Sequence, residues 1–179
     1  MNKDKSARKR RTRRVAICAI LSAMGVVILY LGALIDVLDL SVAVIASLLC
    51  VFAVIEMGGA WPWLIYAVVS VLSLVLLPQK SPAVVFALYA GYYPILKAYL
   101  ERLPRVLSAV LKIAAFNLAF SALIFAMKYL LALPDSGAEF SLLVYALGNL
   151  TFILYDIALT RVISAYFRVF RARLHIRNI

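Results

Sequence analysis

Long runs of apolar residues, separated by short polar breaks, fill almost the whole chain. A helix needs about 20 mainly apolar residues to cross the hydrocarbon core of a bilayer, with a range of roughly 17 to 25. Six runs meet or approach this length and predict an all-α protein with six transmembrane helices: residues 15–35, 40–57, 61–77, 83–100, 106–133 and 140 to about 169. The weak break at Gly58-Gly59-Ala60 leaves a second interpretation open, in which the second and third runs form a re-entrant pair.

The prolines support the same borders, because proline is tolerated in the first turn of a helix or just beyond its end. Only Pro94 lies inside a predicted helix, where it removes one backbone hydrogen bond and predicts a kink with a partly free carbonyl at Ala90. The other five lie at predicted helix starts (Pro62, Pro82, Pro104) or ends (Pro78, Pro134).

The composition excludes a soluble domain. Hydrophobic residues make up 66% of the 179 positions, charged residues only 15%, and the mean hydropathy is +1.01. Soluble domains are about half apolar. We therefore expect a multi-pass protein of the cytoplasmic membrane. The run at 15–35 is longer than the 7 to 15 apolar residues of a cleaved signal peptide, so we expect it to remain as the first membrane helix.

The net charge of +11 comes from basic residues at the chain ends. Eight lie within residues 1–14 and five between Arg161 and Arg177, beside apolar runs, which favours anionic lipid rather than nucleic acid as their partner. Short cytoplasmic loops carry the excess of Lys and Arg. With Lys97, Arg102 and Arg105 counted in one loop, this rule predicts both termini in the cytoplasm. The predicted domains are basic tails at 1–14 and 170–179 around a membrane domain at 15–169.

Polar groups inside predicted membrane helices are costly and are candidates for function. Lys112 and Asp156 lie toward the same side on antiparallel helices, so we hypothesise an intramembrane ion pair. Two alternatives stay open: extension of Lys112 to the headgroups, and pairing of Asp156 with Arg161 or with a backbone group. Asn117 and Asn149 lie deeper and could contact a solute or bridge two helices.

No catalytic or metal-binding constellation occurs in the sequence. The one histidine, His175, lies in the basic tail, no phosphate-binding loop is present, and Cys18 and Cys50 have no metal-ligand spacing. We expect the two cysteines to be small buried hydrophobic residues. The expectation is a protein without cofactor or metal that is not an enzyme.

Small residues mark the first predicted helix, where Ala19-x-x-x-Ala23 lets another helix approach closely. The size, six helices, basic start and this motif together resemble the substrate-binding S component of energy-coupling factor (ECF) transporters, or a relative of that family. The resemblance rests on overall architecture and one short motif. It implies ATP-driven uptake of a vitamin-like small molecule with a transmembrane coupling protein and cytoplasmic ATPases.

Residue roles follow from this resemblance. It implies that Ala19 and Ala23, extended by Ala16, dock onto the coupling protein. It also implies that substrate enters from outside, between the loop after the first helix and the outer halves of helices four to six. The implied substrate-binding residues are Tyr89, Asn117, Ser121, Tyr145 and Asn149. Two other classes remain open: a structural or regulatory membrane subunit, and a membrane protein acting on lipid.

Overall fold

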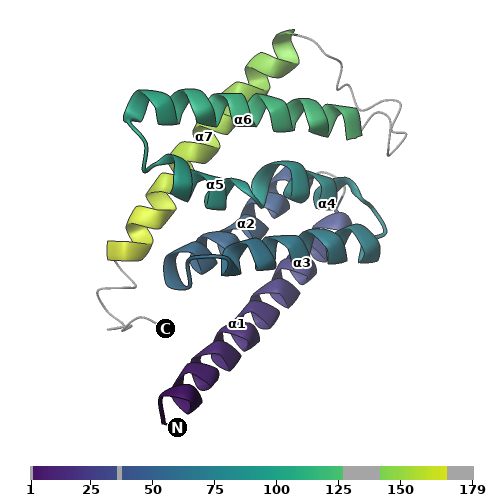
Figure 1. Cartoon of the computed structure of the whole chain (residues 1–179). Helices are drawn as coiled ribbons and strands as arrows, with labels where there is room; N and C mark the ends of the chain where they lie inside the picture. Colours follow the sequence, from purple (N-terminus) through teal and green to yellow (C-terminus); the bar gives the residue numbers. More distant parts are fainter. Residues whose placement is uncertain (1, 36–37, 127–141, 169–179) are drawn as a thin grey trace.

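The protein is helical throughout the part of the chain that the structure, a computed structural model, describes: residues 2–35, 38–126 and 142–168 (Figure 1). In chain order the elements are α1 (Asn2–Ala33), α2 (Asp39–Glu56), α3 (Trp61–Leu76), α4 (Ser81–Val85), the π-helical turn η1 (Phe86–Ala90), α5 (Tyr93–Leu100), α6 (Arg105–Phe125) and α7 (Leu142–Tyr166).

Five stretches of these helices are long and apolar enough to cross a membrane: residues 11–33, 39–56, 81–100, 105–125 and 142–166. The third of them combines α4, η1 and α5. Helix α3 has 16 residues, so it is about 24 Å long at 1.5 Å per residue. The described chain is all-helical, as predicted, and its five long apolar stretches are consistent with a membrane protein. The predicted segments from 127 to 141, with Pro134, and from 169 to the C-terminus, with His175, lie outside the described residues.

Helix α2 is the centre of the packing and contacts α1, α3, α4, η1 and α5. The residues that it buries are mostly small: Ala43, Ala46, Ser47, Cys50, Val51 and Ala53. Small side chains let helix backbones approach closely, which is how helices pack in lipid, where burial of apolar surface supplies little driving force. Gly32 of α1 continues this close contact, since a Cβ there would come within 2.5 Å of Val42.

A two-glycine turn joins α2 to α3. Gly58 and Gly59 both have positive φ, of 58° and 61°, a conformation that residues with a Cβ rarely adopt. Pro62 then lies in the first turn of α3. The weak break in the sequence is therefore a tight helical hairpin that brings α3 back against α1 and α2.

The fourth predicted membrane helix is broken in the middle. Gly91 N–H donates to the Phe86 carbonyl at 2.7 Å, closing the π-helical turn, and Pro94 lies in the first turn of the next helix, α5. Since Pro94 has no N–H, the Ala90 carbonyl has no donor from its own helix. The Tyr155 hydroxyl of α7 donates to that carbonyl instead, at 3.2 Å. The kink and the free carbonyl expected from the sequence are both present.

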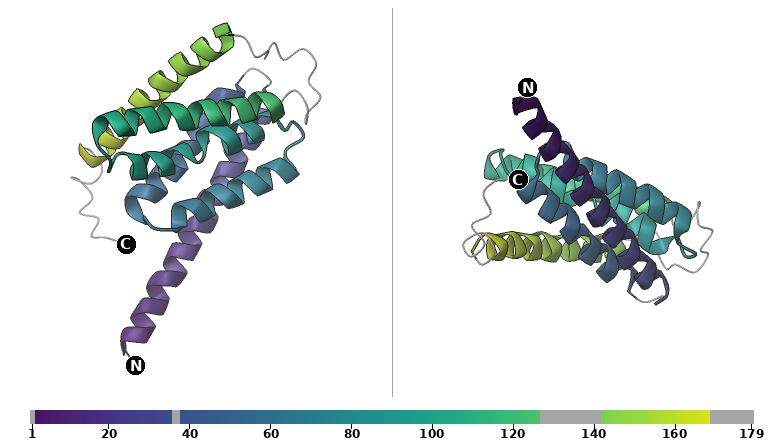
Figure 2. Two further views of the ribbon diagram at one scale, coloured as in Figure 1. Left: turned by 45° about the horizontal axis from the view of Figure 1, so that its top comes forward. Right: turned by 90° about the horizontal axis from the view of Figure 1, so that it is seen from below.

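Helices α6 and α7 cross on the face of α5 and η1 that is turned away from α1 and α3 (Figures 1 and 2). They bury few of their residues. An aromatic cluster connects them to the rest of the bundle, with Phe116 stacked on Phe152 at 4.6 Å between ring centroids and Tyr93 edge-on to Phe152 at 5.1 Å.

Two details differ from the sequence predictions. Lys97, counted there as a loop cation, lies in α5 with only 1% of its surface exposed, because its ammonium group contacts Asp156 and Thr160 of α7. Residues 2–14 of the expected basic tail continue α1 as helix, since lysine and arginine are good helix formers. Cys18 and Cys50 are buried and free, as expected.

The Tyr155 hydroxyl should contribute to stability, because it partners the Ala90 carbonyl and lies 2.9 Å from the Ser47 hydroxyl. We expect Tyr155→Phe to lower the free energy of unfolding by about 1–2 kcal/mol, the cost of an unpaired buried polar group. Thermal unfolding in detergent measures this. Tyr99→Phe is the matched control, since Tyr99 is 46% exposed; equal melting temperatures for the two variants would contradict the assignment.

Candidate functional site

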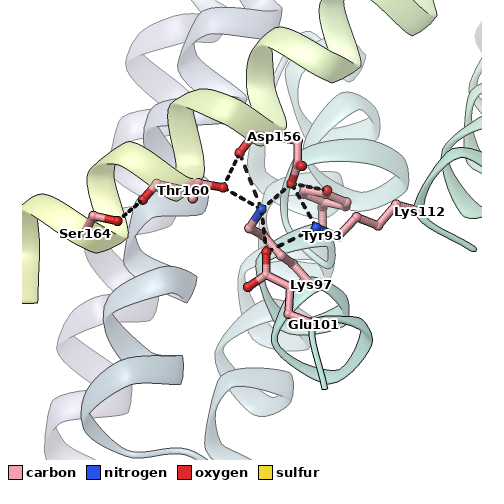
Figure 3. Close-up of polar contacts among 7 residues, drawn as sticks. All are labelled: Tyr93, Lys97, Glu101, Lys112, Asp156, Thr160 and Ser164. Atoms are coloured by element: carbon pink, nitrogen blue, oxygen red, sulfur yellow. Dashed lines mark hydrogen bonds and ion pairs between the residues drawn. The ribbon is translucent and has the colours of Figure 1, made fainter. Parts of the chain in front are cut away.

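A cluster of charged side chains joins α5, α6 and α7 (Figure 3). At its centre is the ammonium group of Lys97, which donates to the Asp156 carboxylate, to Glu101 Oε1 at 2.9 Å and to Thr160 Oγ1 at 2.8 Å. Lys97 and Glu101 are one helical turn apart, so they lie on the same face of the chain. Asp156 and Thr160 show the same spacing on α7.

The Asp156 carboxylate is contacted from two other helices, α5 and α6. The Tyr93 hydroxyl donates to Oδ1 at 2.6 Å, and Lys112 Nζ lies 3.5 Å from the same oxygen. Lys112 also donates to Glu101 at 3.1 Å. The hypothesised Lys112–Asp156 contact is thus present, but Lys97 is the closer partner. No ion pair between Asp156 and Arg161 occurs among the described residues.

The cluster is electrically balanced, with two ammonium groups and two carboxylates. Burying an unpaired charge is very costly, and pairing with good hydrogen bonds offsets that cost. Glu101 lies just beyond the membrane-spanning part of α5. Partial burial alone would raise the pKa of its carboxyl, but the hydrogen bonds from Lys97 and Lys112 lower that pKa below its ordinary value. Glu101 therefore stays ionised at neutral pH.

A second set of polar side chains links α6 and α7, in the halves of these helices that lie away from the charge cluster. Asn117 and Asn149 donate to each other's side-chain carbonyl, both at 3.1 Å. Farther along, the Ser121 and Tyr145 hydroxyls lie 2.8 Å apart. Four of the five residues implied as substrate-binding therefore form two pairs across one helix contact, and in this state they satisfy one another.

The fifth residue, Tyr89, lies beside these pairs. Its side chain is 5% exposed, and its hydroxyl has no hydrogen-bond partner among the described residues. Tyr89 borders a cavity of about 120 Å³ whose other walls are nearly all apolar: Leu40, Phe116, Phe120, Leu123, Gly148 and Thr151. A buried hydroxyl without a partner is rare in native proteins and needs an explanation.

The three alanines implied as a docking surface lie on the outside of α1. Ala16, Ala19 and Ala23 are all exposed, and the N-terminal part of this helix projects away from the other helices (Figures 1 and 2). Nothing in the described chain covers this strip.

The class that the fold indicates is an all-helical protein with several helices long and apolar enough to cross a membrane, and polar side chains gather between the last three of these. Groups of three or more metal-ligating residues are absent from the described part of the chain. No protein-family model matches the chain, and neither a curated protein nor a solved structure is significantly similar to it.

The sequence analysis missed the central member of the charge cluster. Lys97 was assigned to a loop because it stands close to Arg102 and Arg105, although Tyr93, Lys97 and Glu101 follow one another at helical spacing. That spacing placed a hydroxyl, an ammonium and a carboxylate on one face of a helix, and it was the signal that could have found the site.

Lys97 should be far more important for folding than Lys112, since Lys97 is fully buried whereas Lys112 has 12% of its side chain exposed. We expect Lys97→Met to destabilise the protein by about 3–5 kcal/mol, because it leaves the partly buried Asp156 carboxylate without its closest counter-ion. Lys112→Met should be much milder. Fluorescence-detected size-exclusion chromatography after heating measures both.

The double variant Lys97→Met/Asp156→Asn provides the control for charge. It should recover most of the lost stability, because it removes the unpaired carboxylate as well as its partner. If Lys97→Met and Lys112→Met lower the melting temperature equally, the ranking of the two lysines is wrong.

Proposed function

We propose that the chain crosses the cell membrane six times with both termini in the cytoplasm. The support is the distribution of charge: sixteen of the 19 basic residues lie on one side in this arrangement. The first turns of α1, Arg105 at the start of α6 and the end of α7 then share the cytoplasmic side. The Asn117–Asn149 and Ser121–Tyr145 pairs lie toward the outer half.

Within this arrangement the protein is the substrate-binding subunit of an ATP-driven uptake system, and it has no catalytic role of its own. The observation that carries this proposal is Tyr89, which lines an apolar cavity and whose buried hydroxyl has no hydrogen-bond partner in the described part of the chain. An unsatisfied hydroxyl bordering a cavity is suited to a ligand that supplies the missing hydrogen bond.

The cavity indicates the kind of ligand. Its lining is apolar apart from Tyr89 and Thr151, which fits a largely apolar, vitamin-like molecule with one hydrogen-bonding group. Ligand sites usually have volumes of about 300–1,000 Å³, so a cavity of about 120 Å³ would have to widen to hold such a ligand. Separation of the Asn117–Asn149 and Ser121–Tyr145 pairs would widen it, since both pairs join the two helices that flank it.

Energy for uptake must come from partners, because the chain has no phosphate-binding loop. The exposed strip of Ala16, Ala19 and Ala23 is suited to a transmembrane coupling protein, since small residues let another helix pack closely. Cytoplasmic ATPases would bind to that partner. The basic turns of α1 lie beside the strip, where they attract anionic lipid.

Docking is tested by replacing one alanine of the strip. We expect Ala19→Leu to reduce the recovery of coupling protein and ATPases at least tenfold in affinity purification from native membranes, because the leucine side chain keeps the partner helix away. Ala114→Leu is the control, since Ala114 is also exposed but lies on α6. Equal recovery with both variants would exclude the strip as the docking surface.

Ligand capture is tested by removing the Tyr89 hydroxyl. Tyr89→Phe should leave the melting temperature nearly unchanged, since the hydroxyl has no partner to lose among the residues that the structure describes. The amount of small molecule that copurifies, measured by mass spectrometry of a solvent extract, should fall about tenfold, the effect of one hydrogen bond of about 1.4 kcal/mol. An unchanged extract would rule out Tyr89 as a ligand contact.

A further inference from the structure

A second cavity lies at the opposite end of α6 and α7 from Tyr89. Its volume is about 350 Å³, and it is bounded by the α5–α6 connection and by one face of each helix. The polar residues on its wall are Glu101, Arg105, Ser108, Lys112 and Asp156; the apolar ones include Leu103, Ile113, Phe152, Ile153 and Ile157. Neither the sequence motifs nor the proposed uptake function uses this cavity.

The charges on the wall favour an anion. Glu101 and Asp156 are already neutralised by Lys97 and Lys112, which contact both carboxylates. Arg105 adds a positive charge and has no ion pair among the described residues. The wall and its buried partner Lys97 together carry a net charge of about +1, which one negative charge would balance. A metal cation would have to displace an ammonium group from each carboxylate.

Hydrogen-bond donors point to the same kind of ligand. Ser108 is 6% exposed, and its hydroxyl makes no hydrogen bond to any described residue although it borders the cavity. Arg105 and Ser108 belong to the first turn of α6, a helix of 21 residues that has no capping side chain. The first amides of a helix lack partners within it and favour negative charge. A buried hydroxyl, a guanidinium and a helix N-terminus therefore converge on one space.

The cavity is also open to the membrane. Val106, Ile153 and Ile157 beside it are 79%, 47% and 51% exposed, and such apolar surface on membrane-spanning helices faces acyl chains. Arg105 begins its helix, at the level of the lipid headgroups, and Lys112 is seven residues deeper, which is about 10 Å along the helix. A ligand with a charged head near Arg105 and an apolar tail along Ile153 and Ile157 would match both surfaces.

We propose that this cavity binds the phosphodiester group of a monoanionic phospholipid. The phosphate lies between Arg105, the Ser108 hydroxyl and the first amides of α6, and the acyl chains run along α7. Arginine is well suited to the phosphate because its planar guanidinium can donate two parallel hydrogen bonds. The bound lipid fixes α6 and α7 relative to each other at the end opposite the Tyr89 cavity.

The test is native mass spectrometry of the full chain in detergent, titrated with phosphatidylglycerol or with phosphatidylcholine of the same acyl chains. Both lipids have the phosphodiester, but only phosphatidylglycerol carries the net negative charge that the wall lacks. We expect one phosphatidylglycerol to bind about tenfold more tightly than phosphatidylcholine. Arg105→Gln should weaken this binding about tenfold, and Ser108→Ala severalfold, in line with the loss of single hydrogen bonds to a charged group.

Arg102→Gln is the matched control. Arg102 is near Arg105 in the chain and carries the same charge, but it packs over the Tyr99 ring at 5.4 Å and does not line the cavity. Unchanged binding with Arg102→Gln supports the site, whereas equal weakening with both variants would mean a diffuse attraction to basic surface and overturn it. Equal affinity for the two lipids also overturns it.

Inorganic phosphate separates a lipid headgroup from a free anion. At millimolar concentration it should not displace phosphatidylglycerol, because it lacks the apolar chains that contact Ile153 and Ile157. Displacement would assign the cavity to a soluble anion and overturn the lipid proposal. Folding of each variant is checked by its melting temperature without added lipid. This should match that of the wild type, because Arg105 is exposed and the Ser108 hydroxyl has no partner within residues 2–35, 38–126 and 142–168.

Discussion

One carboxylate, that of Asp156, determines how the last membrane segments assemble. A charge on a long apolar helix is tolerated only with a partner, and here the partners come from α5 and α6. Tyr93 and Lys97 reach it together because they are one turn apart on α5. Their face of α5 is set by the break at Gly91 and by Pro94, which starts a new helix. In an unbroken regular helix, the Ala90 carbonyl would accept a hydrogen bond from its own helix and would not need the Tyr155 hydroxyl. The Lys97 side chain would also point in a different direction.

Much of the fold could be predicted from the sequence because bilayer thickness and proline chemistry act locally. The apolar runs predicted the boundaries of the apolar helices, and most of the described helix ends lie within two residues of the predicted ones. Pro94 predicted the kink. The buried state of Lys97 could not be predicted from local composition, since its partner Asp156 is 59 residues away. The same is true of Tyr155, whose contact with Ala90 spans 65 residues. A hydropathy profile registers a charged residue, but it does not show which distant helix supplies the counter-ion.

Helices α6 and α7 are joined differently from the rest of the bundle. Small buried side chains hold α1, α2 and α3 together, whereas hydrogen bonds and ion pairs make up much of the contact between α6 and α7. Hydrogen bonds between membrane helices contribute only about 0.6–2 kcal/mol each. The α6–α7 contact therefore has the low local stability from which moving parts are usually drawn. Both cavities lie along this contact.

The unbroken length of α1 restricts what can lie against it. At 32 residues it is about 48 Å long, longer than the roughly 30 Å hydrocarbon core. Lys9 and Arg13 continue the line of Ala16, Ala19 and Ala23, because residues three or four apart share one side of a helix. A neighbour packed against the alanines would therefore meet two cations within the next two turns. Such a neighbour would need acidic groups, or lipid phosphates between the two proteins, at the level of Lys9 and Arg13. The two cations therefore restrict the position along α1 at which a partner can pack.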